Sequence, residues 1–250
     1  MTQNTESPGT RVTPPVVSGP PRAWWRHPYP WLVTLAVLVV FNLIYALPRY
    51  LSMDPAQSRS ILAPNSTIHW PLLVAHVVTG NVAMVTVFLQ LWPWLRRNHP
   101  AVHRFIGRVY VFAGALPAAL LGIFALVPLR SEQAGIPGLV AMGVLWTLTT
   151  LVAVRMARRR RYAEHRRWMV YSFALAMGTT WGRLLYLLIV GVPGFDMDHV
   201  TIYLEVANLG WVFNLLGAHA WMEWRAVRTS RAGNQVITYP SPIERADARD

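Results

Sequence analysis

The sequence contains no cysteine and no lysine, and only 14% of its 250 residues are charged. Without cysteine the chain can form no disulfide, hold no iron–sulfur cluster through thiolates and attach no haem through a Cys-x-x-Cys-His motif. Soluble domains carry roughly 25% charged residues. The low charge and the 54% share of hydrophobic residues therefore indicate a membrane protein. Any haem would have to depend on histidine or methionine ligands.

Motifs of soluble enzymes are missing as well. The sequence has no Gly-rich phosphate loop, no G-x-S-x-G elbow and no H-E-x-x-H pair. A net charge of +12 often accompanies nucleic-acid binding, but here the arginines lie in short stretches between apolar segments. Membrane topology and anionic lipid explain that placement. We therefore expect no nucleic-acid partner, and we identify no metal-ion site.

Six segments are long and apolar enough to cross a bilayer, which takes about 20 residues. They cover approximately residues 31–49, 70–92, 105–127, 138–156, 168–190 and 202–224. We expect an all-α fold, a polytopic membrane helix bundle with about six transmembrane helices. Residues 29–228 make up this domain. Residues 1–28 and 229–250 are expected to be disordered tails, because they have no sustained apolar period.

Arginine is distributed unevenly between alternate flanks of these segments. Fifteen arginines flank one side, whereas only Arg49, Arg59 and Arg130 fall on the other. Cationic loops resist translocation, so the arginine-rich side and both termini should be cytoplasmic. We expect a multi-pass protein of a bacterial cytoplasmic membrane, from an arginine-favouring genome, whose inner face contacts anionic headgroups.

Two similar phrases mark the cytoplasmic start of the third and fifth segments. One is NHPAVHRFIGRVY at 98–110, and the other is AEHRRWMVYSFALAM at 163–177. One interpretation is interfacial and structural, with arginines on headgroups and aromatic rings fixing the depth. The residues concerned are Arg104, Arg108, Tyr110, Arg166 and Trp168.

The same phrases place His103 and His165 at the same depth on two parallel helices. Facing histidines at one depth can bind haem iron from both sides, so a second interpretation makes this pair the axial ligands of a haem b. A quinone or proton site is a further alternative for the pair.

Three ionisable residues fall in the outer half of the expected bundle. His76, Arg183 and Glu205 lie at depths that agree within one or two helical turns. An arginine inside the bilayer is costly unless it is paired or hydrated, and Glu205 is the partner that the sequence suggests.

Two interpretations of this outer group stay open. It is either a structural salt bridge between two helices, or, with Asn81, a pocket for a small anionic or lipid-derived ligand. In the second case His76 or Glu205 could also move a proton, as in a membrane-embedded enzyme acting on an isoprenoid or lipid substrate.

The sequence resembles the bacterial integral-membrane family known as domain of unknown function 2306. The resemblance covers roughly residues 70–190 and depends on H-x-x-x-G at His76 and Gly80, on LQLWPWLRRNHPAVHRFIGRVYV, and on EHRRWMVYSFAL with the later Arg183. It implies a four-helix core, one further helix on each side, and no established activity. A weaker similarity to histidine-ligated membrane cytochromes b implies a haem b site at His103 and His165.

Overall fold

The computed structural model describes residues 30–58, 66–129, 136–190 and 199–235. Side chains are described within these ranges except at 185–186, 189–190, 199–209 and 231–235. The described residues form helices and no strand, which confirms the all-α prediction. The tail predicted for 1–28 lies outside the described residues, as do residues 236–250.

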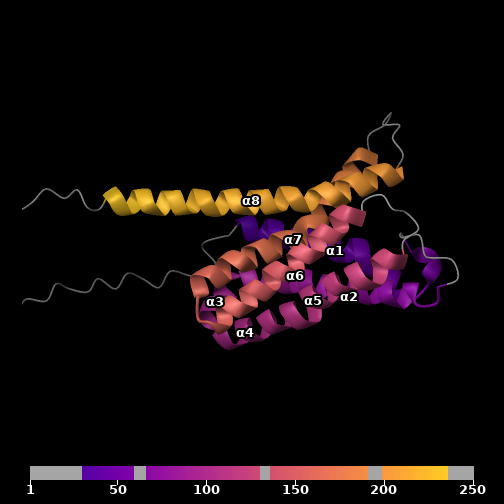
Figure 1. The fold of residues 1–250 in the computed structure, drawn as a ribbon, viewed down its shortest axis with the longest axis horizontal. Helices are drawn as coiled ribbons and strands as arrows, with labels where there is room; N and C mark the ends of the chain where they lie inside the picture. Colours follow the sequence, from indigo (N-terminus) through magenta and orange to yellow (C-terminus); the bar gives the residue numbers. More distant parts are fainter. Residues whose placement is uncertain (1–29, 59–65, 130–135, 191–198, 236–250) are drawn as a thin grey trace, which may run out of the picture.

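The long helices cross the bundle in alternate directions (Figure 1). They are α1 (Pro30–Leu51), α2 (His69–Leu91), α6 (Ile136–Arg158), α7 (Tyr162–Val190) and α8 (His199–Gln235). Between α2 and α6 lies a continuous helical stretch, here called the α4–η5 rod. It consists of α4 (Pro100–Val109), the π-helical turn η3 (Tyr110–Ala115), α5 (Leu116–Leu120), the π-helical turn η4 (Leu121–Leu126) and the 3-10 turn η5 (Val127–Leu129). The short helices η2 (Pro55–Gln57) and α3 (Pro93–Asn98) follow α1 and α2.

Four of these elements are long and apolar enough to cross a membrane, namely α1, α2, the α4–η5 rod and α6. The described residues of α7 and α8 do not reach the same apolar standard. Both are nonetheless long: at about 1.5 Å per residue, the 29 residues of α7 and 37 of α8 exceed the roughly 30 Å of a hydrocarbon core. The protein is a helical membrane bundle, and the count of six spans stays a prediction.

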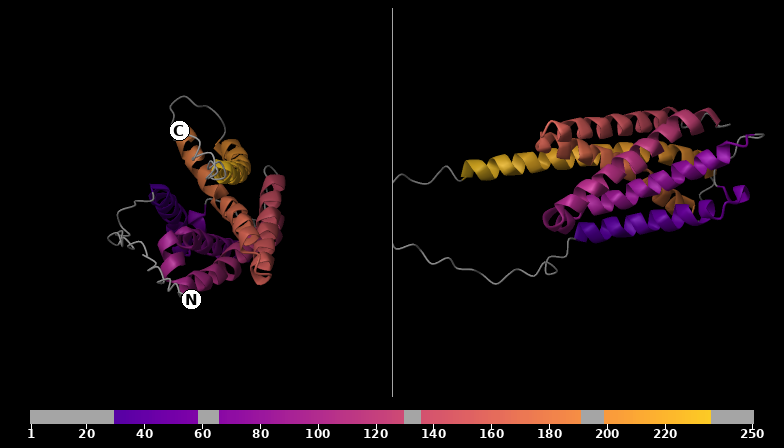
Figure 2. Two further views of the ribbon diagram at one scale, coloured as in Figure 1. Left: turned by 90° about the vertical axis from the view of Figure 1, so that its left-hand side faces the viewer. Right: turned by 90° about the horizontal axis from the view of Figure 1, so that it is seen from below.

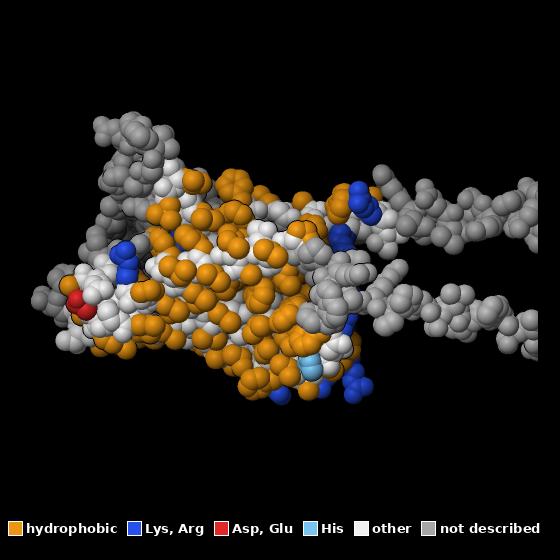
Figure 3. All heavy atoms as spheres, turned by 180° about the vertical axis from the view of Figure 1, so that it is seen from behind, with side chains coloured by type: hydrophobic (Ala, Val, Ile, Leu, Met, Phe, Trp, Pro, Cys, Tyr) orange, Lys and Arg blue, Asp and Glu red, His pale blue; other side chains and the backbone are white. Residues whose placement is uncertain are grey.

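The surface of the bundle is suited to lipid. Figure 3 shows hydrophobic side chains over most of one face, with charged side chains gathered toward the two ends. Large apolar side chains are exposed on several helices, among them Val33, Ile44, Phe112, Phe124 and Leu151. An apolar surface of this extent is unfavourable in water and is solvated by lipid tails.

The bundle has two distinct ends. α1 begins and α8 finishes at the same end, which we call the inner end, and the opposite one is the outer end (Figure 2). Most of the arginines in the described loops lie at the inner end. α8 continues to Gln235, so the tail predicted from residue 229 is corrected, and this part of α8 projects beyond the other helices (Figure 1).

Glycines allow two pairs of helices to approach closely. A Cβ at Gly114 in η3 would lie 2.9 Å from the Cα of Ala83 on α2. A Cβ at Gly210 on α8 would lie 2.8 Å from the carbonyl oxygen of Gly178 on α7. Both overlaps involve backbone atoms, which no rotamer change can move. Small residues at such contacts are how membrane helices pack tightly.

The two π-helical turns flank Pro117, the only residue of α5 without a backbone N–H. A regular α-helix cannot continue through a proline unchanged, because one hydrogen bond is lost and the ring crowds the preceding turn. The π-helical turns are where the rod departs from α-helical geometry, and such turns are frequent at functional sites. They flank the segment of the rod against which His76 packs.

Candidate functional site

A group of polar side chains lies between α1, α2 and α7 in the outer half of the bundle. We call it the outer cluster, and it consists of Asn42, Tyr45, His76, Thr180 and Arg183. Arg183 donates a hydrogen bond to Oδ1 of Asn42, and the Asn42 amide donates to Oγ1 of Thr180. Asn42 and Thr180 are completely buried. The Asn42 side chain therefore joins α1 to α7 and holds the guanidinium in place.

The Arg183 guanidinium also lies over the ring of Tyr45, with 5.5 Å between Cζ and the ring centroid. A cation at this distance is attracted by the ring quadrupole, and more strongly where water is excluded. Tyr45 follows Asn42 by three residues, so one face of α1 supplies both contacts. Glu205, the partner suggested by the sequence, has its side chain outside the described residues.

His76 lies on α2 with its ring against the α4–η5 rod. Its Nδ1 is 2.9 Å from the carbonyl oxygen of Ala118, and a Cβ at Gly122 would lie 3.4 Å from its Cε1. A carbonyl oxygen can only accept, so Nδ1 carries the proton and Nε2 of the neutral ring is an acceptor or base. The Arg183 guanidinium is close enough to His76 for their charges to interact. His76 and Arg183, whose depths predicted from the sequence agree, are therefore also near each other across the bundle.

Asn81 and Gly80 lie about one turn further along α2. The Asn81 amide donates to the carbonyl oxygen of Val77 at 2.7 Å, which sets the orientation of the amide. Its Oδ1 is buried and accepts no hydrogen bond from the described residues. A Cβ at Gly80 would meet no atom within 4 Å. Because buried polar atoms nearly always have a partner, the unpaired Oδ1 of Asn81 indicates a position for an outside donor.

The histidines of the two repeated phrases form a second site near the inner end. His165 on α7 has its Nδ1 2.9 Å from the carbonyl oxygen of Ala153, so this nitrogen is the donor and Nε2 is the acceptor. The Nδ1 of His103 on α4 is buried and has no partner among the described residues. The two rings are near enough that a charge on His165 would act on His103. Gln90 fixes the backbone here by donating to the carbonyl oxygen of His103 at 2.7 Å.

Tyr110 closes a ring of hydrogen bonds in the interior. Trp146 Nε1 donates to the Tyr110 hydroxyl at 3.1 Å, and the Tyr110 and Ser172 hydroxyls are 2.6 Å apart. Ser172 is 2.7 Å from the Thr150 hydroxyl, which donates to the carbonyl oxygen of Trp146 at 2.7 Å. Each hydroxyl has one proton, so the direction is set: Trp146 to Tyr110, Tyr110 to Ser172, Ser172 to Thr150, and back to Trp146.

This ring corrects the interfacial role expected for Tyr110, whose side chain has no exposed surface. The other members of that group lie where lipid headgroups or water can reach them. Arg104, Arg108 and Arg166 are exposed. Trp168 is half-buried against the core, with its ring centroid 5.9 Å from that of Tyr171.

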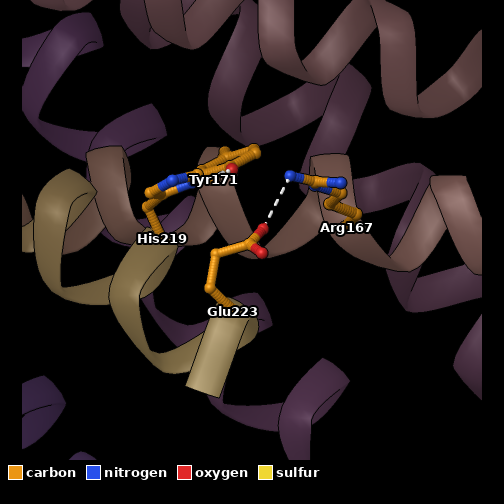
Figure 4. A network of polar contacts seen from close by, with 4 residues as sticks. All are labelled: Arg167, Tyr171, His219 and Glu223. Carbon is orange, nitrogen blue, oxygen red and sulfur yellow. Dashed lines mark hydrogen bonds and ion pairs between the residues drawn. The ribbon is translucent and has the colours of Figure 1, made fainter. Parts of the chain in front are cut away.

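Four polar residues join α7 to α8 near the inner end (Figure 4). Arg167 forms an ion pair with Glu223 at 3.1 Å, and the Tyr171 hydroxyl lies 2.8 Å from Nδ1 of His219. The members on each helix are four residues apart, so two antiparallel helices meet in register over one turn. His219 therefore pairs with Tyr171, and this network is best explained as a link between helices.

No group of three or more histidine, cysteine or carboxylate side chains in the described part of the chain could hold a metal ion. A search of curated proteins and a search of solved structures found no match. A family model described as "Predicted membrane protein (DUF2306)" matches residues 73–222. The match extends beyond the expected limit near residue 190 and includes α2 from Leu73 onward, the α4–η5 rod, α6, α7 and the first two thirds of α8. It covers more than half of the chain, so this protein belongs to the DUF2306 family of predicted membrane proteins.

Proposed function

We propose that the outer cluster binds a small or lipid-derived anionic ligand. The observation that carries this proposal is the position of Arg183, whose guanidinium is fixed inside the bundle by Asn42 and Tyr45 and lies near His76. Asn42 and Tyr45 set the position and orientation of this guanidinium within the bundle. Arginine is costly inside a membrane and is found there mainly where it serves a substrate or ion.

The remaining groups fit a ligand that carries both an anionic end and a donor. A phosphate or carboxylate accepts hydrogen bonds from a guanidinium, often two in parallel. A hydroxyl or protonated oxygen of the same ligand would find acceptors in Nε2 of His76 and Oδ1 of Asn81. The open space at Gly80 gives room for it. An enzyme acting on an isoprenoid or lipid would use the same groups, with Nε2 of His76 as the base.

The proposal is tested by identifying what remains bound to the protein after purification in mild detergent. Wild-type protein should retain an anionic molecule enriched over bulk lipid, as measured by negative-ion mass spectrometry of the extract. Arg183→Gln should retain at least about tenfold less, because a part-buried charged contact is lost. Arg49→Gln removes an exposed arginine at the outer end and serves as the control.

A second variant separates ligand loss from misfolding. Gly80→Leu fills the open space without meeting protein atoms at its Cβ, so it should displace the ligand while leaving the stability of the bundle unchanged. Equal retention by wild type, Arg183→Gln and Gly80→Leu would contradict the proposal, as would the absence of any enriched anion.

A haem b at His103 and His165 is the second candidate function. Histidines that bind a metal through Nε2 commonly donate Nδ1–H to a backbone carbonyl, and His165 makes this contact with Ala153. His103 supplies a buried ring nitrogen without a partner among the described residues, close to His165. A haem held there would supply one-electron transfer, with the two imidazoles as its axial ligands.

The haem candidate predicts a coloured protein. Wild-type protein from haem-replete cells should show a Soret band and a sharp α band after reduction with dithionite. His103→Ala and His165→Ala should each abolish the α band, whereas His99→Ala, at an exposed inner-end position, should keep it. Colourless wild-type protein would rule this candidate out.

We also propose that the inner end faces the cytoplasm of a bacterial cell and contacts anionic headgroups. The support is the excess of arginine at that end, since cationic segments resist export and the inner leaflet carries anionic lipid.

A further inference from the structure

A groove runs along the surface between the α4–η5 rod and α6, toward the inner end. Phe112, Leu116 and Leu151 contribute to its apolar floor, and Arg155, Arg158 and Arg159 line one end. Its volume is about 550 Å³, within the roughly 300–1,000 Å³ of small-molecule sites. Phe112 and Leu151 are 59% and 47% exposed, so the floor is open to lipid.

The groove exists because the rod and α6 diverge toward the inner end. In the outer half they touch closely, and a Cβ at Gly143 would lie 2.8 Å from a side-chain carbon of Ile123. Further inward, Trp146 Nε1 of α6 donates to the Tyr110 hydroxyl of the rod at 3.1 Å, so two large side chains lie between the same two helices. These large side chains hold the backbones apart. On the lipid-facing side of this contact, residues of the two helices therefore line the groove instead of packing against one another.

Apolar and cationic residues follow one another along the α6 wall of the groove. On α6, Leu151, Arg155, Arg158 and Arg159 occur at intervals of four, three and one residues, which places them on one helix face. The arginines of α6 lie near the end of this helix, so they line the groove at the inner end. Arg161 and Arg167, which do not line the groove, form ion pairs with Glu164 and Glu223.

We propose that this groove binds an anionic phospholipid of the leaflet at the inner end. One acyl chain lies along Phe112, Leu116 and Leu151, and the phosphate contacts the arginines. The charge of the groove selects this occupant, because three exposed guanidiniums within five residues favour a headgroup with net negative charge. A zwitterionic lipid would add an ammonium group beside the arginines, and a free phosphate would leave the apolar floor unused. The site is separate from the outer cluster and does not depend on it.

Native mass spectrometry of the full chain in detergent, titrated with palmitoyl-oleoyl phosphatidylglycerol or the matching phosphatidylcholine, tests this proposal. The wild type should bind one phosphatidylglycerol at least about tenfold more tightly than phosphatidylcholine. Removing three cationic contacts should weaken that binding by about 100-fold, at roughly 1 kcal/mol for each arginine. The groove variant is Arg155→Gln, Arg158→Gln and Arg159→Gln combined. Its control is Arg96→Gln, Arg97→Gln and Arg166→Gln, which removes equal charge from the same end.

Neither triple variant removes a buried contact, because all six arginines are exposed. The control should retain phosphatidylglycerol within about threefold of the wild type, and a loss equal to that of the groove variant would mean diffuse attraction and overturn the proposal. Leu151→Trp, which fills the floor while keeping every arginine, should also weaken binding at least about tenfold. Unchanged binding in Leu151→Trp, or full competition by inorganic phosphate, would show that only a headgroup is recognised and would equally overturn it.

Discussion

Replacing Gly114 with alanine is expected to lower the free energy of unfolding by about 2 kcal/mol. Alanine favours a helix over glycine by up to about 1 kcal/mol, so local propensity alone predicts a gain. The new Cβ, however, would lie 2.9 Å from both the Cα and the backbone nitrogen of Ala83. Overpacking costs about 1–3 kcal/mol, and the cost reaches or exceeds the upper end of this range where backbone atoms must move. Unfolding of the purified protein with increasing SDS in mixed micelles measures the change.

Gly217→Ala and Gly80→Ala are the matched controls for Gly114→Ala. A Cβ at either position meets no atom within 4 Å, so both variants should be as stable as the wild type or more stable. Gly210→Ala, which forces α8 away from Gly178, should behave like Gly114→Ala. If all four variants had the same stability, the close helix contacts described above would be wrong.

Tyr110→Phe is expected to destabilise the protein by about 1–3 kcal/mol through unpaired groups in the interior. The variant keeps the aromatic ring and its T-shaped contact with Phe173, whose centroid is 4.9 Å away. It removes the acceptor of Trp146 Nε1–H and the donor to Ser172, both buried. The same SDS unfolding measurement applies, with Tyr162→Phe, at an exposed position, as the control.

A double-mutant cycle examines the hydrogen-bond ring itself. Ser172→Ala already interrupts the ring, so adding Tyr110→Phe to it should cost less than Tyr110→Phe costs in the wild type. Strictly additive effects would show that the two hydroxyls do not interact, in conflict with their 2.6 Å separation.

The helices could be predicted because apolar length and arginine placement are local properties of the sequence. Both determine where each segment begins, how deep each residue lies and which ends come together. Local pattern does not show the two π-helical turns around Pro117, because they depend on how the rod packs against its neighbours. The extension of α8 to Gln235 was missed because an apolar criterion cannot detect a helix that continues outside lipid.

For the candidate sites as well, the sequence predicts the depth of a residue along its helix but not which neighbouring helix its side chain faces. Depth along a helix predicts that His76 and Arg183 share a site, and the Arg183 guanidinium lies near enough for its charge to act on His76. The contacts of Arg183 with Asn42 and Tyr45 depend on which face of α1 turns toward α7, and this requires the packing order. The position of Tyr110 in the sequence gives its depth along the helix but not the direction of its side chain. The expected interfacial role is therefore wrong, because the hydroxyl points into the bundle toward Ser172.

The two ends of the bundle have different chemistry. In the outer half the Arg183 guanidinium contacts Asn42 and Tyr45, whereas the inner end carries exposed arginines on several helices. A part-buried guanidinium held by neighbouring side chains suits a specific ligand, and exposed guanidiniums above an apolar groove suit lipid. Variants of one site should therefore leave binding at the other unchanged.

The central claim is that the outer cluster is a ligand site. A cryo-electron microscopy map of the wild type in lipid nanodiscs, at a resolution that shows side chains, tests it most directly. We expect non-protein density within hydrogen-bonding distance of the Arg183 guanidinium and of Nε2 of His76, extending into the space beside Gly80. A map in which Arg183 is paired with Glu205 and no such density is present would contradict the claim and leave a structural salt bridge in its place.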